Sequence, residues 1–199
     1  MSKVNKLIKL FMNNSLGVRM KNLILLFVVV LCSLIVVAPA LSQNKYVGVK
    51  QCSMCHKADK TGNQFGVWSK SLHAEAYKVL TSDKAKEVAK KAGLKKPAAE
   101  SPECLGCHTV TADAKLLDKT FDVKEGVTCE ACHGAGSAYK SMSVMKDKAK
   151  AITAGLVMYK DEKEMEKKCV TCHNDKSPTF KGFKFSDAWP KIKHAKPKS

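Results

Sequence analysis

Four C-x-x-C-H motifs constrain what this chain can fold into more than any other feature. They lie at residues 52–56, 104–108, 129–133 and 169–173 of the 199 residues. Two thiols three positions apart lie on one side of a helical turn, where both can form thioethers with the two vinyl groups of one haem. The histidine that follows then reaches the iron. The motifs therefore predict covalently attached c-type haem.

All but one of the nine cysteines belong to these motifs, and the exception, Cys32, lies near the N-terminus. Zinc sites and disulfides also use paired cysteines, but neither explains a histidine after every second cysteine. A thioredoxin-like C-x-x-C occurs once, in a βαβ setting. We therefore predict four covalently bound c-type haems, each with one iron. The predicted attachment thiols are Cys52, Cys55, Cys104, Cys107, Cys129, Cys132, Cys169 and Cys172, and the predicted proximal iron ligands are His56, His108, His133 and His173.

The N-terminal segment has the pattern of a secretory signal. A basic region precedes an apolar run at residues 23–37, and Ala38 and Ala40 supply small residues at the cleavage positions. We predict a signal peptide at residues 1–40, a tetrahaem domain at residues 41–199 and a periplasmic location. The alternative is an uncleaved inner-membrane anchor, because the apolar run approaches the length of ~20 residues that spans a bilayer.

The chain beyond the predicted signal is strongly basic, and every basic residue in it is lysine. Removal of residues 1–40 takes away the only arginine, Arg19, and leaves 30 lysines against 18 acidic residues, a formal net charge of +12. Nucleic-acid readers favour arginine for bidentate contacts, so we predict no nucleic-acid partner. Strongly hydrated lysines suit brief encounters with an acidic protein. The alternative is that the lysines only solvate the surface and offset haem propionates.

Helical patterns are separated by long loops. Apolar spacing predicts a helix over residues 67–80, with His73 beside its apolar face. A second helix is predicted from a cap at Ser82 or Asp83 to Gly93. Strand patterns are sparse in this part of the chain.

The C-terminal part has helical composition over residues 146–169, with Gly155 as a break. The aromatic tail at residues 177–199 is expected to pack against haem edges. Apolar runs are short, so the polypeptide alone forms only a thin core. We predict a mainly α fold in which a few helices and long loops wrap around four clustered c-type haems.

The chain resembles a known family in four runs. "QCSMCHKA…VWSKSLHAEAY", "CLGCH", "GVTCEACHGAGS" and "CVTCH" follow, in this order, the pattern of the tetrahaem cytochrome c-554 family over roughly residues 50–173. The resemblance implies a mainly helical fold with stacked haem pairs. It also implies that three haems have two histidine ligands and that the second haem is five-coordinate. The founding member of the family accepts electrons from hydroxylamine oxidoreductase.

Counting histidines limits the axial ligands. The six histidines are the four of the motifs plus His73 and His194. Four haems need eight histidines for full bis-histidine ligation, so at least two irons lack a second histidine from this chain. The resemblance implies that His73 ligates the third haem and that His194 ligates the fourth. The second haem is then the open one.

The segment after the third motif departs from the family pattern, which has a distal histidine there for the first haem. This chain has Met142 and Met145 instead, and a thioether is an established haem ligand. We predict Met145 as the ligand, with Met142 as the second candidate. Tyr139 is a further candidate, and packing of both methionines against a porphyrin face is the structural alternative.

These features predict a periplasmic tetrahaem c-type cytochrome that transfers electrons through closely packed haems. The predicted partners are redox proteins with acidic docking surfaces, and a membrane-associated quinol or reductase complex is a further candidate. The alternative function is a redox enzyme that acts on nitric oxide or hydroxylamine at an open second haem. The sequence supplies no evident acid–base pair for that chemistry, so no catalytic residue is assigned.

Overall fold

The computed structural model describes residues 43–196. The predicted signal peptide at residues 1–40 lies outside the described residues, so its cleavage and the periplasmic location stay predictions. Within the described range, no helix is both long enough and apolar enough to cross a membrane. The described residues include all four C-x-x-C-H motifs.

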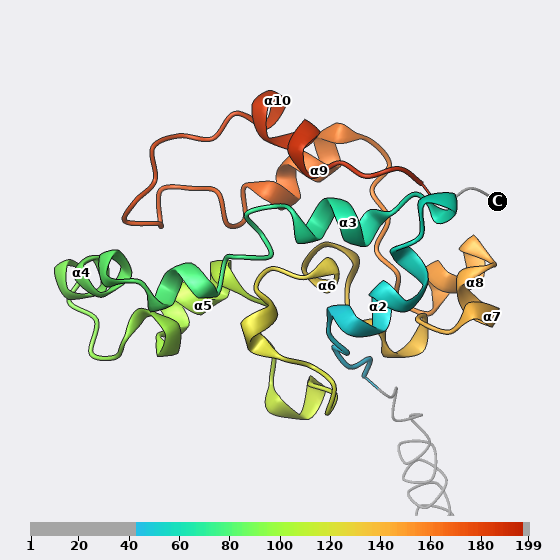
Figure 1. Cartoon of the computed structure of the whole chain (residues 1–199), viewed down its shortest axis with the longest axis horizontal. Coiled ribbons are helices and arrows are strands. Elements are labelled where there is room, and N and C mark those ends of the chain that lie inside the picture. The colour runs from blue at the N-terminus through green and yellow to red at the C-terminus, as the bar shows by residue number, and fades with distance from the viewer. Residues whose placement is uncertain (1–42, 197–199) are drawn as a thin grey trace, which may run out of the picture. The chain divides into compact units, whose positions relative to one another are not determined.

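Short helices joined by loops make up this part of the chain, and no strand occurs among residues 43–196 (Figure 1). The nearest approach to a sheet is one parallel bridge between Tyr46 and Leu117. The predicted mainly α class is confirmed. The α-helices are α2 (Val49–His56), α3 (Gln64–Ser69), α4 (Asp83–Lys91), α5 (Pro102–His108), α6 (Cys129–His133), α7 (Met142–Met145), α8 (Lys148–Thr153), α9 (Glu162–Cys169) and α10 (Phe185–Ala188). The 3-10 turns are η1 (Asp59–Thr61), η2 (Lys78–Thr81), η3 (Ala98–Glu100), η4 (Ala114–Leu116), η5 (Val123–Glu125), η6 (Gly136–Ala138) and η7 (Trp189–Lys191).

Each C-x-x-C-H motif begins on a helix. Helices α2, α5 and α6 end at the motif histidine, whereas α9 ends at the first cysteine of the fourth motif and turns continue to His173. Ordinary caps start two of these helices. Pro102 occupies the first position of α5, and the Asp161 side chain accepts a hydrogen bond from the Glu164 backbone N–H (2.9 Å) at the start of α9.

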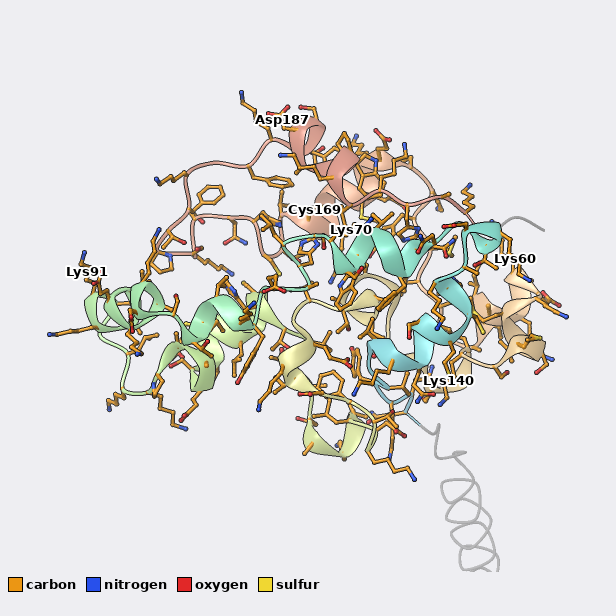
Figure 2. The ribbon with its side chains drawn as sticks, viewed as in Figure 1. Lys60, Lys70, Lys91, Lys140, Cys169 and Asp187 are labelled. Atoms are coloured by element: carbon orange, nitrogen blue, oxygen red, sulfur yellow. The ribbon has the colours of Figure 1, made fainter. Side chains whose placement is uncertain are left out.

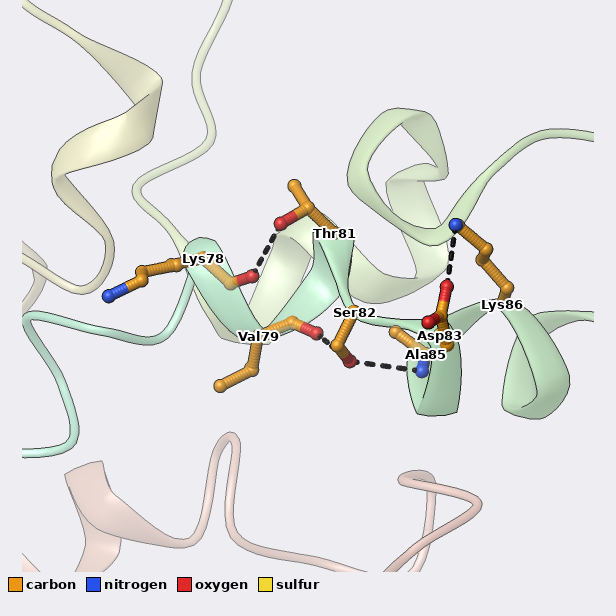
Figure 3. A network of polar contacts seen from close by, with 7 residues as sticks. All are labelled: Lys78, Val79, Thr81, Ser82, Asp83, Ala85 and Lys86. Atoms are coloured by element: carbon orange, nitrogen blue, oxygen red, sulfur yellow. Dashed lines mark hydrogen bonds and ion pairs between the residues drawn. The ribbon is translucent and has the colours of Figure 1, made fainter.

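The predicted helix that precedes Gly93 is confirmed, and Ser82 is its cap. Ser82 Oγ accepts a hydrogen bond from the Ala85 backbone N–H (3.2 Å), and Lys86 pairs with Asp83 in the first turn (2.7 Å; Figure 3). Gly93 follows the helix with a φ of +69°, a left-handed conformation that glycine adopts without strain. Helix α4 therefore begins and ends where its local sequence predicts.

The predicted break at Gly155 is also confirmed. Helices α8 and α9 lie on either side of it, and its φ is +104°. Asn44 Nδ2 donates to Ala154 O (2.7 Å), and a Cβ on Gly155 would lie 2.5 Å from that nitrogen. Glycine is needed here both for the backbone conformation and for the close approach of Asn44.

The long helix predicted around His73 is wrong. Helix α3 ends at Ser69, and turns follow up to η2. Carbonyl groups in these turns bond to distant parts of the chain: His73 O accepts from Val127 N–H (3.0 Å), and Ala76 O faces Nδ1 of His108 (2.7 Å). Contacts with the second and third motifs therefore override the local helical pattern.

The apolar core of the described residues is small. Eight hydrophobic residues are buried, and Leu80, Ala89 and Ala98 form one cluster among them. Several large apolar side chains are exposed instead; Leu72, for example, is 88% exposed and Met54 is 67% exposed. Both lie beside predicted haem ligands, where a porphyrin would supply apolar surface that the polypeptide lacks.

Candidate functional site

The first and third motifs lie together. Helices α2 and α6 pack against each other, and the thiols of Cys52 and Cys129 lie close enough to shift each other's pKa. Interaction with Cys129 and burial raise the pKa of the Cys52 thiol, whereas interaction with Cys52 lowers the pKa of Cys129. All eight motif thiols are free rather than paired in disulfides.

The second and fourth motifs form a corresponding pair. Burial and the proximity of Cys172 raise the pKa of the Cys107 thiol, and Cys172 Sγ is 4.0 Å from Gly106 O. The third and fourth motifs adjoin through Tyr159. Its hydroxyl donates to Cys132 O (2.8 Å), and burial beside Cys132 and Cys169 raises the pKa of Tyr159 to about 12. The motifs therefore follow one another in space in the order first, third, fourth, second.

The surroundings of the thiols suit a neutral sulfur. Burial raises the pKa of Cys104, Cys107 and Cys169, and it raises the pKa of Cys132 to about 11. An environment that disfavours the thiolate accommodates a thioether, which carries no charge. The thiols thus fit covalent attachment to haem.

Three of the four motif histidines hold Nδ1 against an oxygen acceptor. The pairs are His56 with Gln64 Oε1 (3.2 Å), His108 with Ala76 O (2.7 Å) and His133 with Val157 O (3.0 Å). Each acceptor keeps the proton on Nδ1 and leaves the Nε2 lone pair free, as in metal-ligating histidines with an outer hydrogen-bond partner. The fourth, His173, stacks on Phe183 with ring centroids 4.6 Å apart.

Both histidines outside the motifs lie against a motif histidine. The ring centroid of His73 is 6.1 Å from that of His173, and the ring centroid of His194 is 6.0 Å from that of His133. Two imidazoles that ligate one metal from opposite sides, each with its nitrogen about 2 Å away, have centroids about 6 Å apart. Burial also lowers the pKa of His73, His133 and His173, which favours the neutral form that ligates. These residues fit two irons with two histidine ligands each.

The pairing of these histidines is the reverse of the one that the resemblance implied. The ring of His73 lies against His173 of the fourth motif, not against His133 of the third, although His73 O bonds to the backbone just before the third motif. His194 lies against His133 of the third motif, not against the fourth, and Glu162 on α9 holds the tail just before it. Its Oε1 accepts hydrogen bonds from Trp189 Nε1 and Lys193 Nζ, both at 2.9 Å.

Among residues 43–196, no second histidine therefore lies opposite the histidine of the first or the second motif. For the first motif, the segment after the third motif does fold back onto α2, since Ser137 bonds to Lys45 and Lys140 Nζ donates to Gln51 Oε1 (3.1 Å). Met145 on α7 is half-buried, and its role as iron ligand stays a prediction.

The two other candidates for the first iron are less suited. Met142 is 63% exposed. Tyr139 is buried, and its hydroxyl donates to Gly134 O (2.7 Å) and His133 O (3.2 Å) within the third motif. Burial also raises the pKa of Tyr139, which opposes the phenolate that would ligate iron. Tyr139 thus stabilises the end of the third motif through its hydrogen bonds to these two carbonyl groups.

Glu130, inside the third motif, is a site residue that the sequence analysis did not assign. It is 2% exposed, and its carboxylate accepts from the backbone N–H groups of Val47 (2.9 and 3.0 Å), Gly48 (2.8 Å) and Gly136 (2.7 Å). The bonds to Val47 and Gly48 hold the start of α2 against α6. The sequence did offer one signal for this role, namely a charged residue between the two cysteines of the motif.

Four C-x-x-C-H motifs with anchored histidines define a c-type cytochrome. The family model described as "Cytochrome c554 and c-prime" matches residues 51–134. Cytochrome c-554 of Nitrosomonas europaea is 29% identical to this chain over 151 residues, which are 70% of this chain and 62% of the relative. These matches support a c-type cytochrome similar to the c-554 family, a class of protein that binds haem c covalently. The chain thus spans less than two thirds of the length of this relative, and no solved structure gives a significant match.

Proposed function

We propose that the protein is an exported tetrahaem cytochrome that passes electrons between redox proteins. The observation that carries the proposal is the spatial order of the motifs, in which the thiols of Cys52 and Cys129 lie close together, as do those of Cys107 and Cys172. Haem c, when bound, supplies an iron that accepts and releases one electron. The chain's part is to hold four attachment sites in an unbroken series.

The residues around the sites serve this role in two ways. Backbone carbonyls and one side-chain amide orient the motif histidines through Nδ1, which fixes the imidazole rings before and after a change of charge. Burial keeps His73, His133 and His173 neutral. Ligands that are fixed and neutral need to move little when the iron gains or loses an electron.

Lysines cover the surface through which partners would dock. Four of them pair with carboxylates among the described residues, at distances of 2.7–3.6 Å, and most of the others have no such partner. Figure 2 shows labelled lysines pointing outward from separate elements, such as Lys60 after α2 and Lys91 at the end of α4. This distribution suits attraction of acidic redox partners from several directions. Periplasmic export rests on the signal-like residues 1–40.

A redox titration combined with spin-state spectroscopy of the holoprotein tests the proposal. We expect four one-electron equivalents per chain and at least two low-spin irons with bis-histidine ligation. Substitution His73→Ala is expected to convert one low-spin haem, the fourth, to high spin, and His194→Ala to convert the third. Spectra that neither substitution changes would contradict the proposed ligands.

A second function is supported by the absence of any second histidine at the second motif. His73 and His194 lie at other motifs, so His108 has no histidine opposite it in the described structure. An open iron there would bind nitric oxide or carbon monoxide after reduction. Steady-state turnover of nitric oxide or hydroxylamine would favour a redox enzyme, whereas binding without turnover would favour the electron carrier.

A further inference from the structure

Gln64, at the first position of α3, is a buried polar side chain that contacts two separate parts of the site. Its Nε2 donates to Thr61 O (2.7 Å) and Ala195 O (2.9 Å), and its Oε1 faces Nδ1 of His56 (3.2 Å). The two carbonyl acceptors fix which end of the amide is nitrogen. Oε1 is then the acceptor, and His56 carries its proton on Nδ1.

The other partner, Ala195, is adjacent to His194, whose ring lies against His133. The bond from Gln64 joins segments 131 residues apart. Gly62 makes this approach possible: its φ is +99°, and a Cβ there would lie 2.7 Å from Gln64 Nε2 and 3.3 Å from Ala195 O. The contact between Gln64 and Ala195 thus depends on a glycine at position 62.

We propose that Gln64 is a positioning residue shared by two haem sites. It orients the proximal histidine of the first motif, His56, and it holds the tail that brings His194 to the third motif. The inference rests on the proposed ligation by His194. Because the first and third motifs are also in contact, one amide influences the ligands of both members of a pair.

Two substitutions separate the two roles. In Gln64→Leu, His56 loses its acceptor, becomes a weaker donor to iron, and the potential of one haem shifts upward. In Gln64→Glu, a carboxylate accepts the Nδ1 proton more strongly, and the same potential shifts downward. Both variants lose the donor to Ala195 O, so both are expected to show loss of low-spin signal from one further haem.

Ser69→Ala is the matched control, because it removes a side-chain hydrogen bond from the same helix, α3 (Ser69 Oγ to Gly66 O, 3.2 Å), and leaves His56 and Ala195 untouched. It is expected to change neither potentials nor spin states. His194→Ala should reproduce the loss of low-spin signal. If the leucine variant fails to assemble, the nearly isosteric glutamate variant carries the test through the downward shift.

The outcomes distinguish the inference from the proposed function. Unchanged potentials and spectra in both Gln64 variants, with a normal response to His194→Ala, would overturn the role of Gln64. No response to His194→Ala would overturn the ligand assignment, while opposite shifts in the Gln64 variants would still support the orientation of His56.

Discussion

At the scale of residues, Glu130 stands out because its carboxylate is buried in the protein interior. A fully buried carboxylate is costly unless every oxygen is hydrogen-bonded, and here three backbone N–H groups provide those bonds. Because two of the donors precede α2, the carboxylate of the third motif fixes the position of the first motif.

Substitution Glu130→Gln is therefore expected to destabilise the holoprotein. The amide nitrogen would face backbone N–H donors, and the loss of charged, buried hydrogen bonds lowers the free energy of unfolding by about 2–3 kcal/mol. Chemical denaturation measures this change. Glu166→Gln, on the exposed surface of α9, is the control and should change stability by less than about 0.5 kcal/mol.

Met145 carries the second prediction at this scale. If it ligates the first iron, that haem has histidine and methionine ligands and the highest potential of the four. Met145→Ala should then abolish a methionine–iron charge-transfer band in near-infrared magnetic circular dichroism and lower the highest potential. Met142→Ala is the control, since Met142 is largely exposed. A wild-type protein without the band would show that the first iron has no methionine ligand.

The identities of the motif residues are predictable from the sequence, because chemistry fixes their spacing. Which residues meet in space is not, as His73 and His194 show. Each contacts the motif that the family resemblance assigned to the other. Their partners depend on bonds between distant segments, such as His73 O with Val127 N–H, that leave no local pattern.

At the scale of elements, the C-terminal tail depends on few contacts for its position. Trp189 and Lys193 both donate to Glu162 on α9; Lys193 and Glu162 are exposed and Trp189 is half-buried. Contacts between exposed charged side chains contribute little to stability, because water screens them. The tail that carries His194 is therefore held weakly at Glu162, and it is held separately by the bond from Gln64 to Ala195 O.

Glu162→Ala should raise the fraction of the third haem that has lost His194 only modestly, because the tail loses two exposed contacts that each stabilise it weakly. The expected sign is a partial gain of high-spin signal, measured by paramagnetic resonance. In the wild type, high salt should act in the same direction because it screens the pair with Lys193. Glu166→Ala, on the same helix, should leave the spectrum unchanged; an equal change there would assign the effect to α9 as a whole.

Element boundaries followed the local sequence where caps and glycines set them, as at Ser82, Gly93 and Gly155. They departed from it around His73, where an apolar helical pattern forms turns. The apolar side chains there include Leu72, which is exposed in the polypeptide. Such exposed apolar residues do not pack against a neighbouring helix here. Their periodicity therefore predicts a helix where the chain forms turns.

At the scale of the whole molecule, the polypeptide buries too little apolar surface to fold firmly by itself. Only eight hydrophobic residues are buried among the described residues. We expect the protein without haem to be largely unfolded by circular dichroism and sensitive to proteolysis, whereas the holoprotein is helical and resistant. A haem-free chain with native helix content would contradict this dependence.

We propose that four haems are attached covalently, one at each motif. Mass spectrometry of the denatured holoprotein, followed by mapping of its proteolytic peptides, tests this attachment. We expect a mass increase of four haems and one haem on each of the peptides that contain residues 52–56, 104–108, 129–133 and 169–173. Two or three haems per chain, or disulfides within any of these peptides, would contradict it.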